Sequence, residues 1–269
     1  MTQKIFIDDG NDPRLNDFRD LSTADRRPDR PGGRGLVIAE GTVVVERLLR
    51  SRYPVRALLG VERRIRELAE ELARADLPAY VTSAETMADV VGFKLNRGVL
   101  AVADRPLPPS VEDVVSGARV LAVLEGVGDH ENLGALFRNA SALGVDGVLL
   151  GAGCSDPLYR RSVRVSMGHV LRVPFATFDV WPGGLDMLRE RGFQVAALTP
   201  RRDSVSLRSL RGTAAGRVAL LLGSEGPGLS EEALAASDVI VRIPMVSGVD
   251  SLNVATAAAV AFYEVSGRD

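Results

Sequence analysis

Three short segments in the second half of the chain carry polar and charged residues of the kinds that bind ligands and do chemistry. They are residues 131–139 (ENLGALFRN), 220–229 (LLLGSEGPGL) and 243–255 (IPMVSGVDSLNVA). Each lies at an end of an apolar run that is typical of a β-strand. Together they hold most of the candidate site chemistry of this half of the chain.

The glycine-rich segment 223–228 (GSEGPG) follows an expected strand and precedes a helix that we expect Ser230 to cap. Glycines let a backbone approach a ligand closely. The segment is not a Walker loop, because no Lys-Ser/Thr pair follows, and it lacks the pattern of a dinucleotide-binding loop. A structural turn is an equally good local interpretation. Glu225 favours a site, because an acid among glycines at a strand end contributes little to packing.

The other two segments have structural interpretations that compete with a functional one. Ser251 and Asn253 stand at the start of an expected helix, where Ser251 could serve only as a helix cap. Arg138 stands on an expected helix with an apolar opposite stripe, so it could be a solvated surface residue.

Alternating strands and helices would position these segments. In the first half, the pattern predicts strands at 36–41, 55–60, 78–82 and 98–103 and helices at 42–49, 62–75 and 83–91. This alternation is typical of a small α/β sandwich. In the second half, it predicts strands at 119–126, 145–151, 193–199, 217–223 and 238–244 and helices at 131–144 and 251–266. The sum is a mostly parallel α/β sheet, in which ligands usually bind at the carboxyl ends of the strands.

The helix at 131–144 has a clear amphipathic pattern. We expect Asn132 to cap its start and Gly144 to end it. Its apolar stripe consists of Leu133, Leu136, Phe137, Ala140 and Leu143.

Composition divides the chain into a tail, two domains and a linker. Residues 1–34 are rich in Asp, Arg, Pro and Gly and hold few apolar residues, so we expect a mobile tail. The proline-rich run that starts at residue 106 predicts a linker at 106–117. The first domain is then 35–105 and the second is 118–269.

The remaining composition excludes several protein classes. With 46% hydrophobic and 25% charged residues, the chain reads as globular, and no apolar run approaches the ~20 residues that span a bilayer. The start of the chain does not read as a signal peptide, so we expect a cytoplasmic protein. Cys154 is the single cysteine, which excludes an intrachain disulfide. We expect its side chain to fill a small buried space rather than to act as a nucleophile. Two histidines and one cysteine argue against a zinc site.

Charge is distributed unevenly, although the net charge of −2 argues against a general polyanion binder. Lys4 and Lys94 are the only lysines among 33 basic residues, and arginine suits bidentate phosphate contacts. A GC-rich genome explains this excess of arginine over lysine equally well. The segment 158–173 lacks acids and reads either as an RNA-facing patch or as a solvated helix face; its basic residues are Arg160, Arg161, Arg164 and Arg172.

Taken in this order and spacing, the three segments resemble the signature motifs of the SpoU–TrmH family of the SPOUT superfamily. Its members are knotted, S-adenosylmethionine-dependent RNA 2′-O-methyltransferases. The first segment matches the pattern N-x-G-x-x-x-R through Asn132, Gly134 and Arg138. Relatives commonly have Pro-Gly before the Asn, where this chain has His130-Glu131. His130 is therefore a candidate RNA contact beside its simpler reading as a surface residue.

The resemblance covers about residues 36–266 and implies a fold and an assembly. It implies a mostly parallel sheet with a deep trefoil knot in the second domain, preceded by a small, ribosomal-protein-like α/β domain that binds RNA. It also implies a homodimer, a structured RNA substrate, S-adenosylmethionine as the cofactor, and no metal. Ribosomal RNA is slightly favoured over tRNA, because the first domain is of a ribosomal-protein-like kind.

The resemblance also assigns roles to individual residues. Arg138 would be the catalytic residue, supported in geometry and binding by Asn132, Glu225, Ser251 and Asn253. A guanidinium is a poor general base because of its very high pKa, so we expect Arg138 to organise the RNA phosphate and the attacking hydroxyl. The expected cofactor-binding residues are Leu198, Thr199, Leu222, Gly223, Ser224, Glu225, Gly226, Ile243, Pro244, Met245, Ser251, Leu252, Asn253 and Ala255. The expected RNA-binding residues are Glu40, Asn96, Arg97, Arg138, Arg160, Arg161 and Arg164.

Two other functions compete with an RNA ribose methyltransferase. One is a non-catalytic RNA-binding or ribosome-assembly factor on the same fold, for which loss of Arg138 or of the Ser-Leu-Asn triplet would have been the signal. The other is a nucleotide-dependent α/β enzyme such as a dehydrogenase. Both Arg138 and the triplet at 251–253 are present, which favours the methyltransferase.

Overall fold

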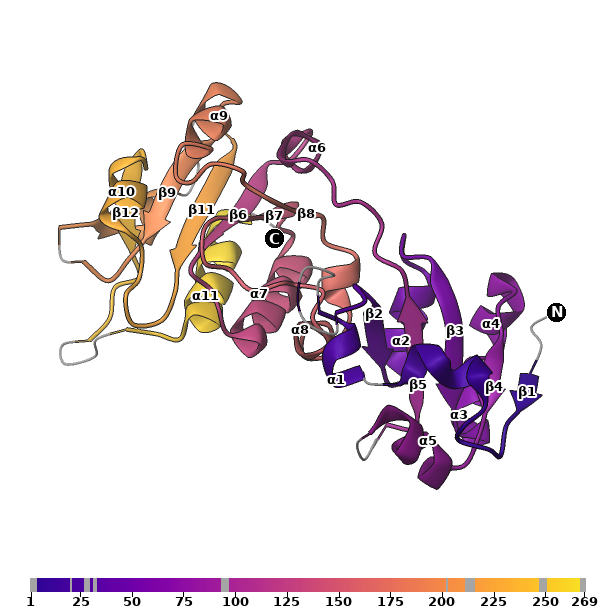
Figure 1. The fold of residues 1–269 in the computed structure, drawn as a ribbon. Coiled ribbons are helices and arrows are strands. Elements are labelled where there is room, and N and C mark those ends of the chain that lie inside the picture. Colours follow the sequence, from indigo (N-terminus) through magenta and orange to yellow (C-terminus); the bar gives the residue numbers. More distant parts are fainter. Residues whose placement is uncertain are drawn as a thin grey trace. The chain divides into compact units, whose positions relative to one another are not determined.

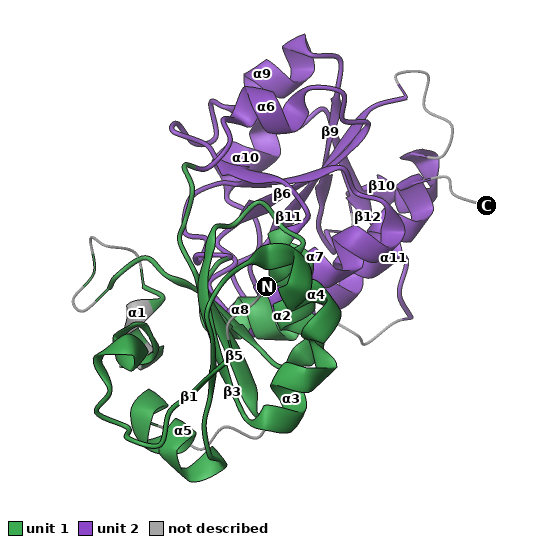
Figure 2. Cartoon of the chain, turned by 90° about the vertical axis from the view of Figure 1, so that its right-hand side faces the viewer, with its two compact units in different colours: residues 1–107, 158–171 green, residues 108–157, 172–269 purple. Residues whose placement is uncertain are grey.

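The computed structural model describes residues 4–19, 21–26, 30, 33–92, 97–201, 203–210, 216–246 and 251–266. It divides into two compact units, which Figure 2 shows in two colours. Unit 1 comprises residues 1–107 and 158–171, and unit 2 comprises residues 108–157 and 172–269. The expected second domain, 118–269, is therefore interrupted, because residues 158–171 pack with the first unit.

Unit 1 is built around a mixed five-stranded sheet in the order β1-β4-β3-β5-β2. Strands β1, β4 and β3 are parallel, whereas β5 pairs antiparallel with both β3 and β2. The strands are β1 (Lys4–Phe6), β2 (Val37–Glu40), β3 (Val55–Gly60), β4 (Ala79–Val81) and β5 (Val99–Ala103). The helices are α1 (Leu21–Ala24), α2 (Thr42–Leu49), α3 (Glu62–Glu67), α4 (Ala69–Ala75), α5 (Ala84–Val91) and α8 (Arg160–Val165), with 3₁₀ helices at Pro13–Phe18 and His169–Leu171.

Unit 2 is built around a seven-stranded sheet in the order β10-β12-β9-β11-β6-β7-β8, and every pair in it is parallel. The predicted α/β class with a parallel sheet is thus confirmed. The strands are β6 (Val120–Glu125), β7 (Gly147–Leu150), β8 (Phe175–Thr177), β9 (Gln194–Leu198), β10 (Val205–Ser206), β11 (Val218–Gly223) and β12 (Val239–Arg242). The helices are α6 (Val111–Val115), α7 (His130–Leu143), α9 (Leu185–Glu190), α10 (Glu231–Ala235) and α11 (Val254–Ser266), with a 3₁₀ helix at Leu207–Leu210.

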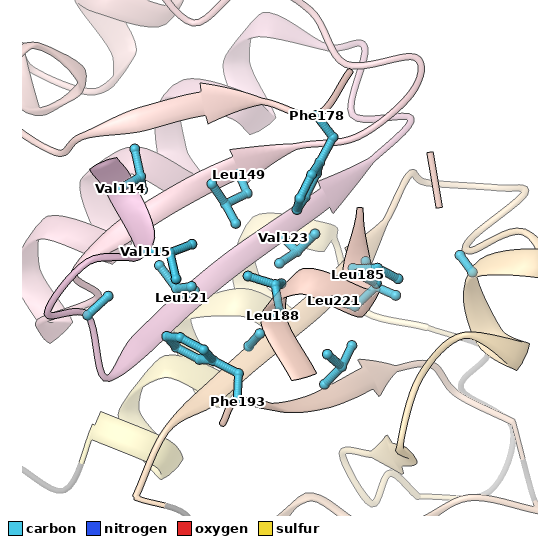
Figure 3. Close-up of a cluster of buried hydrophobic side chains, with 14 of the residues drawn as sticks. Val114, Val115, Leu121, Val123, Leu149, Phe178, Leu185, Leu188, Phe193 and Leu221 are labelled. Atoms are coloured by element: carbon cyan, nitrogen blue, oxygen red, sulfur yellow. The ribbon is translucent and has the colours of Figure 1, made fainter. Parts of the chain in front are cut away.

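Helices cover both faces of this parallel sheet, as Figure 1 shows. Successive side chains of a strand point to opposite faces, so alternate residues of the central strands enter two separate cores. Leu121, Val123 and Leu221 pack against α6, α9 and α10 in one core, and Figure 3 shows this cluster. Helices α7 and α11 pack against each other and contact the sheet through β7 and β11. Burial on both faces explains why the strands read as continuous apolar runs.

Several element boundaries differ from the expectation. The single helix predicted at 62–75 is two helices, because the backbone at the buried Leu68 leaves the helical conformation. The expected linker contains α6, which Ser110 and Asp113 start with a reciprocal capping box. Helix α7 is capped by Asp129 and not by Asn132. The Asp129 carboxylate accepts from the N–H groups of Glu131 and Asn132, at 2.8 Å each, which leaves the Asn132 side chain available for other contacts.

The N-terminal segment also differs from the mobile tail that its composition indicated. Leu15, Phe18 and Leu21 are fully buried in the hydrophobic core of unit 1. The Phe18 ring meets the Tyr80 ring edge to face, with centroids 6.3 Å apart. The few apolar residues of this segment recur every third position on short helical turns, so one face is apolar although the average composition is polar.

None of the helices that the structure describes is both long and apolar enough to cross a membrane.

We expect Phe18→Ala to lower the free energy of unfolding of unit 1 by about 3–5 kcal/mol, because it empties a fully buried aromatic site. Phe6→Ala is the matched control, since Phe6 belongs to the same segment and is 65% exposed. Urea unfolding followed by circular dichroism measures both. Equal and small effects of the two substitutions would show that the segment does not contribute to the core.

Candidate functional site

The carboxyl ends of β9, β11 and β12 and the start of α11 enclose a pocket of about 430 Å³. Parallel strands end at one edge of their sheet, so the segments after them meet there although they are far apart in sequence. This volume is in the range of small-molecule binding sites. The pocket is lined by Leu198, Thr199, Pro200, Arg201, Leu222, Gly223, Ser224, Glu225, Gly226, Pro227, Gly228, Leu229, Glu231, Leu234, Ile243, Met245, Ser251, Leu252, Val254 and Ala257.

The glycine-rich loop after β11 folds tightly back on its own strand. A Cβ on Gly223 would lie 2.4 Å from the carbonyl carbon of Gly228, which no side chain tolerates. Ser224 and Gly228 form an isolated β-bridge across the loop. The glycine at 223 is therefore required by the close approach of the loop's own backbone, as in a tight turn.

A polar network joins one residue from each of the three segments. The Asn253 side-chain amide nitrogen donates to the Asn132 side-chain oxygen at 2.8 Å and also to a carboxylate oxygen of Glu225. The Asn253 side-chain oxygen accepts from the N–H groups of Ala255 and Thr256, at 3.0 and 3.2 Å. Because the helix start occupies this oxygen, the amide can only present its nitrogen to Asn132 and Glu225. Asn253 thus both caps α11 and orients the other two side chains.

A smaller pocket of about 130 Å³ adjoins the large one. Asn132, Glu225 and the loop after β6 line it, and it shares Ser224, Glu225 and Val254 with the large pocket. Toward the residues that the structure describes, the second carboxylate oxygen of Glu225 and the side-chain nitrogen of Asn132 make no hydrogen bond. The small pocket can therefore offer one acceptor and one donor to a bound hydroxyl.

An ion pair at the large pocket escaped the sequence analysis. The Arg201 guanidinium donates to both carboxylate oxygens of Glu231, at 3.0 and 3.2 Å, and lies 3.5 Å from Asp203. The Glu231 carboxylate raises the pKa of Arg201. Nothing in the pattern marked these residues, although Arg201 follows the expected Thr199 closely and Glu231 follows the expected cap Ser230. Ser230 does cap α10, since its hydroxyl accepts from the Ala233 N–H at 3.2 Å.

The structure brings most of the expected cofactor-binding residues together. All of them line the large pocket except Pro244, Asn253 and Ala255. Asn253 acts through the network, and the Ala255 carbonyl accepts from the Asn139 side chain at 2.8 Å. Helix α11 begins at Val254, so Ser251 precedes the helix and lines the pocket instead of capping it.

Arg138 is exposed on α7 and lines neither of the two described pockets. It follows Asn132 by six residues, which turns its side chain by roughly 120° around the helix. Among the described residues, its guanidinium makes no hydrogen bond or ion pair. The structure of a single chain thus separates Arg138 from the network of Asn132, Glu225 and Asn253. His130 is the half-exposed first residue of α7.

The expected RNA-binding residues are placed differently from one another. Glu40 is buried and not on an exposed face, and its carboxylate lies 3.5 Å from Arg164 and 3.9 Å from Arg160. Arg160 also donates its backbone N–H to the buried Asp25 at 2.6 Å. These contacts hold residues 158–171 in unit 1. Because Glu40 is buried, its carboxylate needs the nearby Arg160 and Arg164 in place of solvent. Arg97 and Arg161 are exposed, and Asn96 lies outside the described residues.

Cys154 is half-buried at the edge of the sheet, and its thiol donates to the Leu124 carbonyl at 3.3 Å. Burial raises the pKa of this thiol. This setting fits a packing role. Among the described residues, no group of His, Cys, Asp and Glu is arranged to hold a metal ion.

Comparisons with known proteins point to one family. The model of the SpoU rRNA Methylase family matches residues 119–263. The chain is 58% identical over 257 residues to an uncharacterized tRNA/rRNA methyltransferase of Mycobacterium tuberculosis, covering 95% of this chain and 89% of that protein. It is 32% identical over 208 residues to the 23S rRNA (guanosine-2′-O-)-methyltransferase RlmB of Bordetella pertussis, covering 76% of this chain and 83% of that protein.

A solved structure shares the fold. The AdoMet-bound rRNA methyltransferase of Sinorhizobium meliloti is similar with a TM-score of 0.80, at 23% identity and over 97% of both chains.

We expect Cys154 of the folded chain to react with a thiol reagent such as DTNB at pH 8 at least about tenfold more slowly than in the unfolded chain. Its raised pKa lowers the thiolate fraction at this pH, and burial limits access. The measurement is direct because Cys154 is the single cysteine. The same chain in guanidinium chloride is the control. Equal rates in both conditions would contradict the packing role.

Proposed function

Because the chain belongs to the SpoU rRNA methylase family, we propose that it transfers the methyl group of S-adenosylmethionine to a ribose 2′-hydroxyl of structured RNA. The network of Asn132, Glu225 and Asn253 beside the two pockets is the observation that carries this proposal. The naming of the Bordetella pertussis relative as a guanosine 2′-O-methyltransferase of 23S rRNA supports both the ribose hydroxyl and a preference for ribosomal RNA.

The large pocket fits S-adenosylmethionine in size and chemistry. Leu222, Ile243 and Leu252 supply apolar wall for an adenine ring, and the folded loop after β11 brings backbone N–H and C=O groups close to it. The Glu225 carboxylate beside the pocket suits a positively charged sulfonium. When bound there, the cofactor supplies an electrophilic methyl group.

In this proposal, the chain's own residues orient the attacking hydroxyl. The free carboxylate oxygen of Glu225 accepts a hydrogen bond from the 2′-hydroxyl in the small pocket, and the Asn132 side-chain nitrogen donates one to the ribose. Asn253 holds both side chains so that these groups face the pocket. Holding two reactants in near-attack geometry is the main contribution that such a site can make.

We further propose that the protein acts as a homodimer in the cytoplasm and that unit 2 carries the trefoil knot of its family. Exposed Val260 and Tyr263 on α11, a helix that packs against α7, support a dimer surface on these two helices. In this proposal Arg138, which lines neither pocket of its own chain, organises the RNA phosphate at the assembled site. A monomer at micromolar concentration in light scattering would overturn the dimer.

The proposed function is tested by transfer of tritiated methyl from S-adenosylmethionine to unmodified ribosomal RNA and tRNA transcripts. Label that survives alkali in a 2′-O-methyl dinucleotide would support it and identify the substrate class. RNA binding without S-adenosylmethionine binding would favour the non-catalytic alternative instead.

We expect Arg138→Ala to reduce methyl transfer at least about a hundredfold, with S-adenosylmethionine affinity unchanged, because the residue lines no part of the cofactor pocket. Arg138→Lys keeps the positive charge but loses the two-pronged hydrogen-bonding geometry of the guanidinium, so its rate of methyl transfer should be little above that of Arg138→Ala. Steady-state kinetics with labelled cofactor measures both. Near-native turnover of Arg138→Lys would exclude bidentate positioning.

We expect Asn253→Asp to reduce kcat about ten- to a hundredfold while leaving helix α11 intact. Aspartate caps a helix as well as asparagine does, but it replaces the donor that faces Asn132 and Glu225 with a carboxylate oxygen. Asn11→Asp makes the same chemical change at an exposed position of unit 1 and serves as the control. Unchanged kcat with an unchanged circular dichroism spectrum would remove the network from the mechanism.

A further inference from the structure

Glu125 is a buried acid at the centre of unit 2 that none of the three motifs contains. It is the last residue of β6, and it is only 8% exposed. Among the described residues, no arginine, lysine or histidine forms an ion pair with it. A buried carboxylate without a cation is costly unless donors satisfy it, so its position needs a physical account.

Three hydrogen bonds from two residues satisfy this carboxylate. The Trp181 indole N–H donates to one oxygen at 2.5 Å, and the Ser230 hydroxyl donates to the same oxygen at 2.7 Å. The Ser230 backbone N–H donates to the other oxygen at 2.9 Å. A carboxyl group of this length can accept all three bonds, because both of its oxygens have lone pairs.

Ser230 closes the loop that lines the large pocket. Residues 224–229 all line that pocket, and Ser230 follows them as the cap of α10. The strand end that precedes the loop, Gly223, pairs in register with Glu125 itself. Glu125 therefore holds the beginning of the loop through its place in the sheet and the end of the loop through its side chain.

Trp181, the other residue that donates to the carboxylate, is held in place by packing. Its ring covers Gly151, where a Cβ would lie 2.6 Å from the ring, and it packs on Phe178 with centroids 5.8 Å apart. Trp181 does not line the large pocket. Its N–H thus fixes the direction of the Glu125 carboxylate without contacting the ligand.

We propose that Glu125 is a positioning residue that holds the loop 224–229 in its ligand-binding conformation, while Trp181 orients the Glu125 carboxylate. We call the hydrogen bonds of Glu125 with Ser230 and Trp181 the clasp. The residue acts on the ligand only through the loop. The inference rests on the proposed function in one respect, which is that S-adenosylmethionine occupies the large pocket.

The test is the affinity of Glu125→Gln for S-adenosylmethionine, measured by calorimetry. Glutamine has one acceptor oxygen, and its NH₂ group would face a donor, so at least one of the three bonds is lost. We expect binding about tenfold weaker. Glu190→Gln, at an exposed position at the end of α9, is the matched control and should bind as the wild type does.

Trp181 provides a readout that a purely structural role would not change, because it is the only tryptophan of the chain. S-adenosylmethionine should shift the Trp181 emission of the wild type and of Glu190→Gln through the clasp, and this response should vanish in Glu125→Gln. Trp181→Phe removes the N–H donor and part of the indole, keeps an aromatic ring beside Phe178, and should weaken binding about threefold, which tests the clasp if Glu125→Gln fails to fold.

Affinity within twofold of the wild type in Glu125→Gln, or an emission response that persists in it, would overturn the clasp while leaving the methyltransferase proposal intact. If Glu125→Gln does not fold, unchanged affinity in Trp181→Phe would overturn it. Failure of the wild type to bind S-adenosylmethionine would overturn the proposed function and the clasp together.

Discussion

The parallel pairing of β11 between β6 and β9 is the constraint on which the rest of unit 2 depends. It brings the ends of these strands to one edge of the sheet, so the loops after them meet there without long connections. The pairing also sets Gly223 beside Glu125, which fixes where the glycine-rich loop leaves the sheet. A shift of this register by one residue would turn Leu221 and Leu222 to the wrong faces and would misplace the loop at the same time.

Polar side chains then turn that edge into a site through one shared donor, the Asn253 side-chain nitrogen, and one shared acceptor, the Glu125 carboxylate. The Asn253 amide joins the start of α11 to Glu225 and Asn132, and Glu125 joins β6 to the end of the loop. The oxygen of the Asn253 side chain is engaged by the start of α11, so its nitrogen must face Asn132 and Glu225. Both oxygens of Glu125 are engaged by Trp181 and Ser230. Networks with fixed bond directions favour one arrangement over its neighbours, which suits a site that must hold two reactants in line.

The sequence indicated many of the residues that line the two pockets, whereas it missed several boundaries of the elements. Apolar runs identified the central strands, because burial on both faces leaves few polar residues in them, and those at the strand ends. The three motifs contain residues of the two pockets, but not the segments after β6 and β9 that also line them. The interruption at Leu68 and the cap at Asp129 depend on local backbone geometry, which composition does not report. Short edge strands such as β10 have too few residues to show a pattern. Glu125 was read only as part of a strand, since its role depends on Trp181 and Ser230, which are distant in sequence.

The membership of residues 158–171 in unit 1 has a consequence for synthesis of the chain. The buried acids Asp25 and Glu40 belong to the first 107 residues, whereas Arg160 and Arg164, which face them, emerge from the ribosome much later. Until then, unit 1 holds buried carboxylates that lack these partners, and an unpaired buried charge opposes folding. Unit 1 therefore completes its folding only after more than half of the chain has been translated. A fragment cut after residue 107 lacks the arginines that complete unit 1, so this unit needs the chain as far as residue 171 to stand alone.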